Sequence, residues 1–274
     1  MPERVALVTG STDGIGRQTA RQLAANGMKV IIHGRSKPKV DATLEALRTE
    51  LPGGEFDGVA FDVGTLAGVR RGAEAVLKLA DKLHVLVNNA GIFASERVLN
   101  SDGVEMSFAV NYLGPFLLTE LLGPRLTDSA EGGAASRVIN LSSMAHTRGR
   151  IHFDDITLAN GWTGYAAYAQ SKLAQVMHAL TLADRHEPAK LLAYSVHPGV
   201  VATKLLRQGF GPVQGIPTDS GAKTPVKLAG GLTEDEPSGS YYSDGVATPP
   251  SSIARDAEAR EKLWDLSVKL AKVG

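Results

Sequence analysis

The sequence predicts a single α/β domain, residues 1–274, built on a doubly wound parallel sheet with helices on both faces. Short apolar runs alternate with longer helical segments, which is typical of strand–helix–strand units. The first run opens directly into a glycine-rich turn and a helix, and no repeat or long linker marks a second domain. The expected strands are 5–8, 29–33, 58–61, 84–87, 137–141, 191–196 and 240–242. The expected helices are 15–26, 40–50, 65–83, 102–126, 165–185, 218–229 and 253–273.

The composition excludes several classes of function. Lys plus Arg and Asp plus Glu both number 29, so no net field favours nucleic acid or an acidic membrane surface. The chain has no cysteine, and its seven histidines show no ligand spacing, so we predict no metal and no thiolate chemistry. Residues 1–4 run into an apolar strand without a signal peptide, and no apolar run reaches the ~18 residues of a membrane span. We therefore expect a cytoplasmic protein without nucleic-acid or membrane partners.

The glycine-rich turn after the first strand has the spacing Gly-x-x-x-Gly-x-Gly. Glycines allow the backbone to approach a pyrophosphate closely, and the following helix N-terminus offers free N–H groups to that anion. Three glycines alone are a weak signal, but their position between the first strand and a helix makes a dinucleotide site the stronger interpretation. The predicted pyrophosphate contacts are Gly10, Ser11, Thr12, Asp13, Gly14, Ile15 and Gly16.

A basic residue follows the second predicted strand. Sites for NAD commonly place a carboxylate there, which binds the ribose 2′-OH. Here the position holds Arg35, followed by Ser36, and a guanidinium suits a 2′-phosphate. Asp13 in the glycine loop argues against an extra phosphate, and a solvated turn is the alternative role for Arg35. We predict NADP in preference to NAD, with Arg35 and Ser36 as contacts.

Polar or small residues also follow the third and fourth strands, whose carboxyl ends share one edge of the sheet. Asp62 is expected either to cap a turn or to contact an adenine amino group. Asn88 and Asn89 are too polar for a core, and the small residues behind them leave room for a flat ring. The predicted cofactor contacts here are Asp62, Val63, Asn89, Ala90 and Gly91.

The helix expected over residues 102–126 has Ser101 as its predicted cap. Asn111 lies in its apolar middle, where a buried amide is costly unless it is hydrogen-bonded. Pro115 removes the helical partner of the Asn111 carbonyl. That carbonyl is either a water site or part of a packing kink, and the sequence leaves both open.

The last two strands of the parallel series also end in polar or turn residues. Ser142 and Ser143 follow one strand, and Pro198 and Gly199 form a turn after the other. Thr203 could bind a carboxamide or a phosphate. The Gly/Pro-rich segment within residues 205–230 is predicted to be a mobile substrate lid.

Tyr168 and Lys172 are four residues apart in a segment rich in helix formers, so one helix face should carry both. An ammonium beside a phenol favours the phenolate, and we therefore expect Lys172 to lower the pKa of Tyr168. Such a phenol can act as a general acid or base near neutral pH. Two surface residues of an amphipathic helix are the alternative when this spacing is considered alone.

These motifs occur in an order that resembles the short-chain dehydrogenase/reductase family, which has a Rossmann fold. The resemblance extends from about residue 4 to residue 242. It rests on Thr9-Gly10-x-x-x-Gly14-x-Gly16, Asp62, Asn88-Asn89-Ala90-Gly91, Asn111, Ser142-Ser143, Tyr168-x-x-x-Lys172 and Pro198-Gly199.

The resemblance implies a role for each matched residue. Tyr168 would be the acid or base, and Lys172 would lower its pKa and bind the nicotinamide ribose. Ser143, rather than Ser142, would hold the substrate oxygen, and Asn111 would organise a water linked to Lys172. The implied catalytic residues are Ser143, Tyr168, Lys172 and Asn111, and the further cofactor contacts are Pro198, Gly199, Val201 and Thr203.

Residues 152–155 and 168–174 are similar to the retinol-dehydrogenase-like branch. The chain lacks the N-terminal anchor of many retinol dehydrogenases, which argues against a retinoid, and its lack of cysteine argues against protochlorophyllide reduction. The expected activity is NADP-dependent interconversion of an apolar ketone or aldehyde and an alcohol, in a homodimer or homotetramer paired through the long helices. A non-catalytic NADP sensor, or a C=C reductase or epimerase, remains the alternative.

Overall fold

The structure is a computed structural model that describes residues 4–132, 134–230 and 237–273. These residues form an eight-stranded sheet in the order β3-β2-β1-β4-β5-β6-β7-β8. Neighbouring strands from β3 to β7 are parallel, and β8 pairs antiparallel with β7. The predicted doubly wound parallel sheet is confirmed. The strands are β1 (Val5–Val8), β2 (Lys29–Gly34), β3 (Phe56–Ala60), β4 (Val85–Asn88), β5 (Ser136–Leu141), β6 (Leu191–His197), β7 (Tyr241–Ser243) and β8 (Val246–Ala247).

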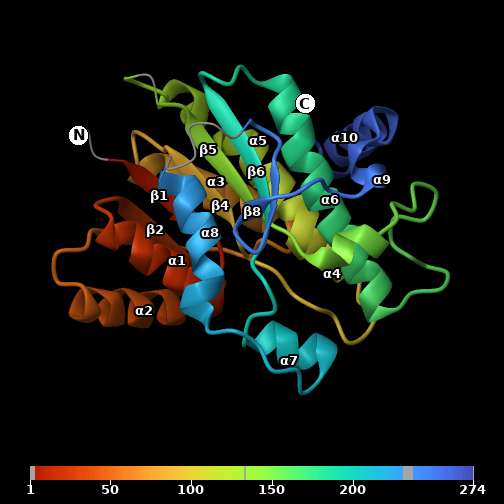
Figure 1. The fold of residues 1–274 in the computed structure, drawn as a ribbon, viewed down its shortest axis with the longest axis horizontal. Helices are drawn as coiled ribbons and strands as arrows, with labels where there is room; N and C mark the ends of the chain where they lie inside the picture. Colours follow the sequence, from red (N-terminus) through yellow and green to blue (C-terminus); the bar gives the residue numbers. More distant parts are fainter. Residues whose placement is uncertain (1–3, 133, 231–236, 274) are drawn as a thin grey trace.

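Helices cover both faces of this sheet (Figure 1). One layer contains α1, α2 and α8, and the opposite layer contains α3, α5 and α6. The short helix α7 lies apart from both layers, at the foot of the view in Figure 1. The helices are α1 (Gly14–Ala25), α2 (Lys37–Glu50), α3 (Leu66–Leu79), α4 (Met106–Phe108), α5 (Gly114–Asp128), α6 (Gly164–Arg185), α7 (Lys204–Phe210), α8 (Thr218–Gly230), α9 (Ser252–Arg255) and α10 (Ala257–Ala271).

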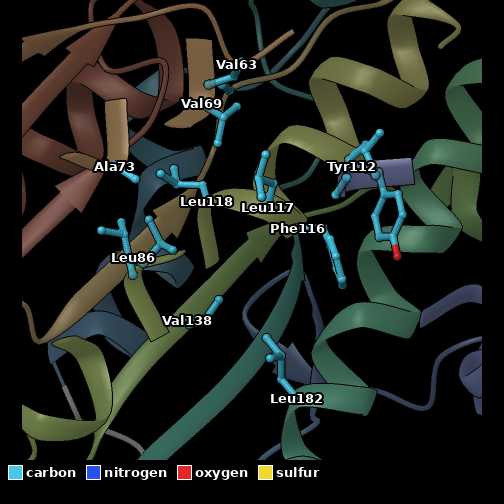
Figure 2. Close-up of a cluster of buried hydrophobic side chains, with 14 of the residues drawn as sticks. Val63, Val69, Ala73, Leu86, Tyr112, Phe116, Leu117, Leu118, Val138 and Leu182 are labelled. Carbon is cyan, nitrogen blue, oxygen red and sulfur yellow. The ribbon is translucent and has the colours of Figure 1, made fainter. Parts of the chain in front are cut away.

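Alternate residues of the central strands face opposite layers. In β1, Ala6 and Val8 belong to the apolar cluster under α1, α2 and α8, whereas Leu7 belongs to the larger cluster under α3, α5 and α6. Figure 2 shows this larger cluster, in which side chains of helices and strands meet. Burial on both faces explains why the strands are almost continuously apolar in sequence.

The helix expected over residues 102–126 is shorter than predicted and changes its winding. It begins at Met106, because the buried carboxylate of Glu105, rather than Ser101, accepts the Phe108 N–H at 2.9 Å. A π segment, Ala109–Leu113, follows, and the N–H of Gly114 bonds to the carbonyl of Ala109. A wider turn accommodates the missing N–H of the proline just beyond it, so the predicted irregularity is present as a π bulge.

The helix expected over residues 253–273 is two helices, because Asp256 leaves the helical conformation and caps α10. α10 packs across α6 and α5. Trp264 of α10 meets the ring of Phe116 at a centroid distance of 5.0 Å, and the Ser267 and Tyr112 hydroxyls are 2.7 Å apart. The two long helices that were expected to pair between subunits are therefore partly covered by the chain's own C-terminal helix.

Within these described ranges, no helix is long and apolar enough to cross a bilayer. Residues 1–3, on which the prediction of no signal peptide partly depends, lie outside the described residues.

Candidate active site

A cleft of about 1190 Å³ runs along the carboxyl ends of the parallel strands. Its walls come from the turns after β1, β2, β3, β4, β5 and β6, from the start of α1, from α7, and from the first turns of α6. The connections reverse direction between β1 and β4, so the cleft lies where doubly wound sheets bind nucleotides.

The glycine loop is held in place by the strand beside it. Gly10 has φ +65°, and the side-chain amide of Asn89 donates to the carbonyls of Thr9 and Gly10 at 2.7 and 3.1 Å. The Thr9 hydroxyl accepts the N–H groups of Asn89 and Ala90, both at 3.0 Å. A Cβ on Gly16 would collide with Asn89 and with the Gly10 carbonyl. The predicted glycine turn is therefore an open backbone cradle, which fits a pyrophosphate.

His33, at the end of β2, supports this loop and was not predicted as a site residue. Its Nδ1 accepts the Gly10 N–H at 3.0 Å, so its Nε2 carries the proton and donates to the Phe61 carbonyl at 3.0 Å. Burial lowers its pKa to about 4, and the neutral ring lies against Phe61 at 4.0 Å between centroids. The signal in the sequence was a histidine inside an otherwise apolar strand.

Most of the residues predicted to bind the cofactor line this one cleft, but two do not. The Ser11 side chain is buried, where its hydroxyl donates to the Val8 carbonyl at 2.7 Å and accepts the His33 N–H at 2.9 Å. Ser36 is the residue immediately before α2, at the N-cap position, and lies outside the cleft wall. Those that line it are Gly10, Thr12, Asp13, Gly14, Ile15, Gly16, Arg35, Asp62, Val63, Asn89, Ala90, Gly91, Tyr168, Lys172, Pro198, Gly199, Val201 and Thr203.

The charged residues of the cofactor end differ in their partners. Arg35 is exposed on the wall and forms no ion pair within the part of the chain that the structure describes. Asp62 accepts the Gly64 N–H at 2.8 Å, so it stabilises a turn. Asp13 caps α1 and pairs with Lys204 of α7 at 2.6 Å, and this bond lowers its pKa. The positive charge of Lys204 therefore offsets the negative charge of Asp13, which argued against the 2′-phosphate of NADP.

Tyr168 and Lys172 lie on one face of α6, as predicted, and both are buried at the cleft wall. The Ser143 hydroxyl lies close enough to the Tyr168 phenol to favour its ionised form. The Lys172 ammonium lies 5.5 Å from the centre of the Tyr168 ring. Tyr168, Ser143 and Lys172 therefore meet at one place, whereas Ser142 turns away and donates to the Lys172 carbonyl at 2.7 Å.

The pKa of Tyr168 is raised in this structure and not lowered as expected. Burial raises it to about 12, and the nearby Ser143 hydroxyl opposes this only in part. Burial lowers the pKa of Lys172 to about 7, because desolvation disfavours its charge. The local pattern in sequence shows that the two groups are neighbours, but it does not show how dry their surroundings are.

Asn111 lies behind the cleft and does not line it. Its side chain accepts the Ile92 N–H at 2.8 Å and donates to the Ile92 carbonyl at 3.0 Å and to the Ser171 hydroxyl at 2.9 Å. The buried amide is therefore satisfied by protein groups, and it ties the segment after β4 to α6. The water that the resemblance assigned to Asn111 stays a prediction.

The substrate end of the cleft is aromatic and apolar. Phe93 lies 5.4 Å from Tyr168 and 5.3 Å from Phe210 of α7, measured between ring centroids. Phe210 is 38% exposed and Met144 is 55% exposed, although both line the cleft. These exposed apolar groups offer a surface that an apolar substrate could cover.

A family model described as short chain dehydrogenase matches residues 4–210. The chain belongs to the short-chain dehydrogenase family. Retinol dehydrogenase 12 of Mus musculus is 37% identical over 281 residues, covering 98% of this chain and 87% of the relative. Polyprenol dehydrogenase of Mus musculus is 36% identical, covering 100% of this chain and 85% of the relative. The expected retinol-dehydrogenase-like branch is confirmed.

Solved structures agree with this assignment. An uncharacterized protein from Mycobacterium paratuberculosis has a TM-score of 0.81 at 32% identity, covering 98% of this chain and 93% of that one. The RhlG protein of Pseudomonas aeruginosa, in an active-site complex with NADP, has a TM-score of 0.73 at 26% identity, with coverages of 88% and 95%. As a family member, the chain is an oxidoreductase that transfers hydride with a nicotinamide dinucleotide.

The described part of the chain contains no group of three or more His, Asp or Glu side chains that could hold a metal ion.

Proposed function

We propose that this protein is an NADP-dependent oxidoreductase that interconverts an apolar ketone or aldehyde and its alcohol. The observation that carries the proposal is that the Tyr168 phenol and the Ser143 hydroxyl lie close together, beside Lys172, at the wall of the nucleotide cleft. A carbonyl oxygen near both hydroxyls would accept hydrogen bonds from each, as an acid-catalysed reduction requires.

In this proposal the protein supplies position and a proton. When bound, NADPH would supply the hydride. Tyr168 would donate its phenolic proton to the substrate oxygen, and Ser143 would orient that oxygen. A buried phenol with a raised pKa carries its proton at neutral pH, and the positive charge of Lys172 would stabilise the phenolate left after the proton is donated. The reverse reaction would use the same phenolate as the base.

Replacing Tyr168 with Phe tests this role directly. We expect turnover to fall by at least about 10³-fold, because the ring is kept and only the proton is lost. NADPH affinity, measured by fluorescence titration, should remain within about twofold of wild type. The substrates would be a panel of apolar aldehydes and ketones, followed at the NADPH absorbance. Turnover retained in Tyr168→Phe would exclude the proposed acid. Wild-type binding of NADPH with no turnover on any substrate would favour the sensor alternative.

The NADP preference rests on Arg35, whose exposed guanidinium lies at the cleft wall without an ion-pair partner in the described residues. Arg35→Asp should weaken NADPH binding at least about tenfold and improve NADH binding, because a carboxylate repels the 2′-phosphate and can bind a 2′-OH. Lys37→Asp is the matched control: Lys37 is close by in sequence but does not line the cleft. An unchanged NADPH-to-NADH ratio in Arg35→Asp would show that another residue selects the cofactor.

Three further expectations stay predictions. The segment 205–230, which includes most of α7 and all of α8, is proposed to act as a substrate lid.

A homodimer or homotetramer is proposed, and light scattering of the purified protein would measure its mass in solution. The packing of α10 on α5 and α6 reduces the helix surface that is available for pairing between subunits. Cytoplasmic location is proposed from composition alone, and fractionation of cells that produce the protein would test it.

A further inference from the structure

Gln175 lies three residues after Lys172 on α6, and both side chains are buried. The Lys172 ammonium donates to the Gln175 amide oxygen at 2.8 Å and to the Leu141 carbonyl at 2.7 Å. We propose that Gln175 is a positioning residue for the reaction, which holds the Lys172 ammonium in place and keeps it charged. This inference rests on the proposed function, because it concerns how the lysine of that site is prepared.

The hydrogen-bond capacity of Lys172 supports this role. An ammonium has three N–H donors and no acceptor. Two donors are used by fixed protein acceptors, one on the same helix and one at the end of β5. The third donor therefore remains for the cleft, whose wall Lys172 forms. The main chain is fixed as well, because the Lys172 carbonyl accepts the Ser142 hydroxyl at 2.7 Å.

Gln175 is itself held on the far side from the cleft. Its backbone carbonyl accepts the Asn140 side-chain amide at 3.1 Å, and Asn140 also accepts from Asn88 of β4 at 2.9 Å. Its amide nitrogen is buried without a partner among the described residues. The opposite orientation of the amide would place N–H groups against an ammonium. The charged Lys172 therefore favours the Gln175 amide with its oxygen toward the ammonium. That oxygen in turn stabilises the charged form of Lys172.

Among the described residues, no carboxylate forms an ion pair with the buried ammonium. Burial is the cause that lowers the pKa of Lys172. Tyr168, on the same helix, has a raised pKa, and His178, one turn beyond Gln175, is kept neutral by a pKa lowered to about 3. His197, at the end of β6 and on the cleft wall, also has a lowered pKa. The charge of Lys172 is therefore stabilised by two neutral acceptors, the Leu141 backbone carbonyl and the Gln175 side-chain amide oxygen.

The test titrates Lys172 in the protein alone, by NMR of lysine labelled with carbon-13 at the Cε, with the signal assigned by its loss in Lys172→Arg. Gln175→Leu should lower the Lys172 pKa by about one unit, since a hydrogen bond to a charged group is lost. Gln175→Glu should raise it by a similar amount. The Asn side chain is too short to reach the ammonium, so Gln175→Asn should lower the Lys172 pKa as Gln175→Leu does. It provides a second polar variant if Gln175→Glu does not fold.

Turnover provides a second readout. The alkaline limb of the pH profile of kcat/KM should move to lower pH in Gln175→Leu and to higher pH in Gln175→Glu, with a loss of about tenfold for the Leu variant at pH 8. Thr181→Val is the matched control. It removes a buried hydroxyl from the same helix, where Thr181 donates to the Met177 carbonyl, and it should leave both readouts unchanged.

Two results would overturn the inference. One is a Lys172 pKa that is the same in wild type, Gln175→Leu and Gln175→Asn. The other is a shift in the same direction for the Leu and Glu variants, which would indicate a general disturbance of packing. Because the NMR titration needs no cofactor or substrate, its outcome is separate from that of the proposed function, which fails only if no turnover depends on Tyr168.

Discussion

The two ends of the cleft are built in different ways. At the cofactor end, the Gly10 backbone is bonded by Asn89 and His33, and all three lie on or beside central strands of the sheet. At the substrate end, Phe210 lies on a seven-residue helix outside both helical layers and contacts its neighbours through aromatic rings. Directional bonds from a rigid sheet suit a ligand of constant shape, whereas ring contacts from a short helix can adjust to different apolar groups.

The ion pair between Asp13 of the glycine loop and Lys204 of α7, at 2.6 Å, links the two ends. Both side chains are largely exposed, so the pair adds little to stability. It does place the start of α7 directly over the cofactor end. The difference between the ends therefore predicts that changes near β1 and β2 affect folding and cofactor binding, whereas changes at the aromatic end of α7, at Phe210, affect substrate binding alone.

The largest effect is expected for Gly16→Ala at the cofactor end. The new Cβ would lie 2.5 Å from the Gly10 carbonyl oxygen and closer still to the Asn89 side-chain amide. Neither group can move away without loss of the hydrogen bonds from Asn89 that hold the loop. We expect NADPH affinity to fall at least about 100-fold and stability to fall by about 3 kcal/mol, typical of overpacking at a rigid site. Fluorescence titration and urea unfolding measure the two effects.

Gly123→Ala in α5 is the matched control for this substitution. Apart from the adjacent residues and the backbone of its own helix, no atom of the described residues lies within 4 Å of the added Cβ, and a helix interior favours Ala over Gly. It should stabilise the protein by ~0.5–1 kcal/mol and leave NADPH affinity unchanged. If Gly16→Ala behaved like this control, the cofactor end would be more adaptable than its hydrogen bonds indicate.

A smaller effect is expected from His33. Its pKa is about 4 in the folded protein and 6.5 in the reference state, so the unfolded chain takes up a proton first as the pH falls. The free energy of unfolding should therefore be unaffected by His33 above pH 6.5 and should decrease as the pH falls toward 4. The loss due to this residue alone should be about 2 kcal/mol at pH 5. Urea unfolding at pH 7.5 and pH 5 should show a loss in wild type that is about 2 kcal/mol larger than in His33→Gln. Equal losses would mean that His33 does not remain neutral when folded.

The smallest effect is expected at the substrate end. Phe210→Ala should raise KM for apolar substrates about tenfold, because one aromatic wall is removed, and should leave NADPH affinity within about twofold. Val246→Ala removes an apolar side chain that is 65% exposed and outside the cleft wall, and it serves as the control. A large loss of NADPH affinity in Phe210→Ala would contradict the separation of the two ends.

The same contrast explains which features could be predicted from the sequence. Strand and helix order, the glycine loop and the Tyr168–Lys172 spacing depend on local chemistry, since periodicity and turn residues act within a few positions. The late start of the helix at Met106 and the division of the C-terminal helix were missed, because the caps Glu105 and Asp256 cannot be told from neighbouring polar residues by local sequence. β8 has only two residues, too few for any pattern.

By itself, the sequence determined the fold class, the family branch and most of the residues that meet at the cleft. Only the tertiary structure decided the state of those residues: the raised pKa of Tyr168, the acceptors of Lys172, and the roles of His33 and Gln175. The physical reason is that desolvation and hydrogen-bond partners come from segments far apart in the chain. A motif shows which groups are neighbours on a helix, whereas the surrounding core determines which of them keep their charge.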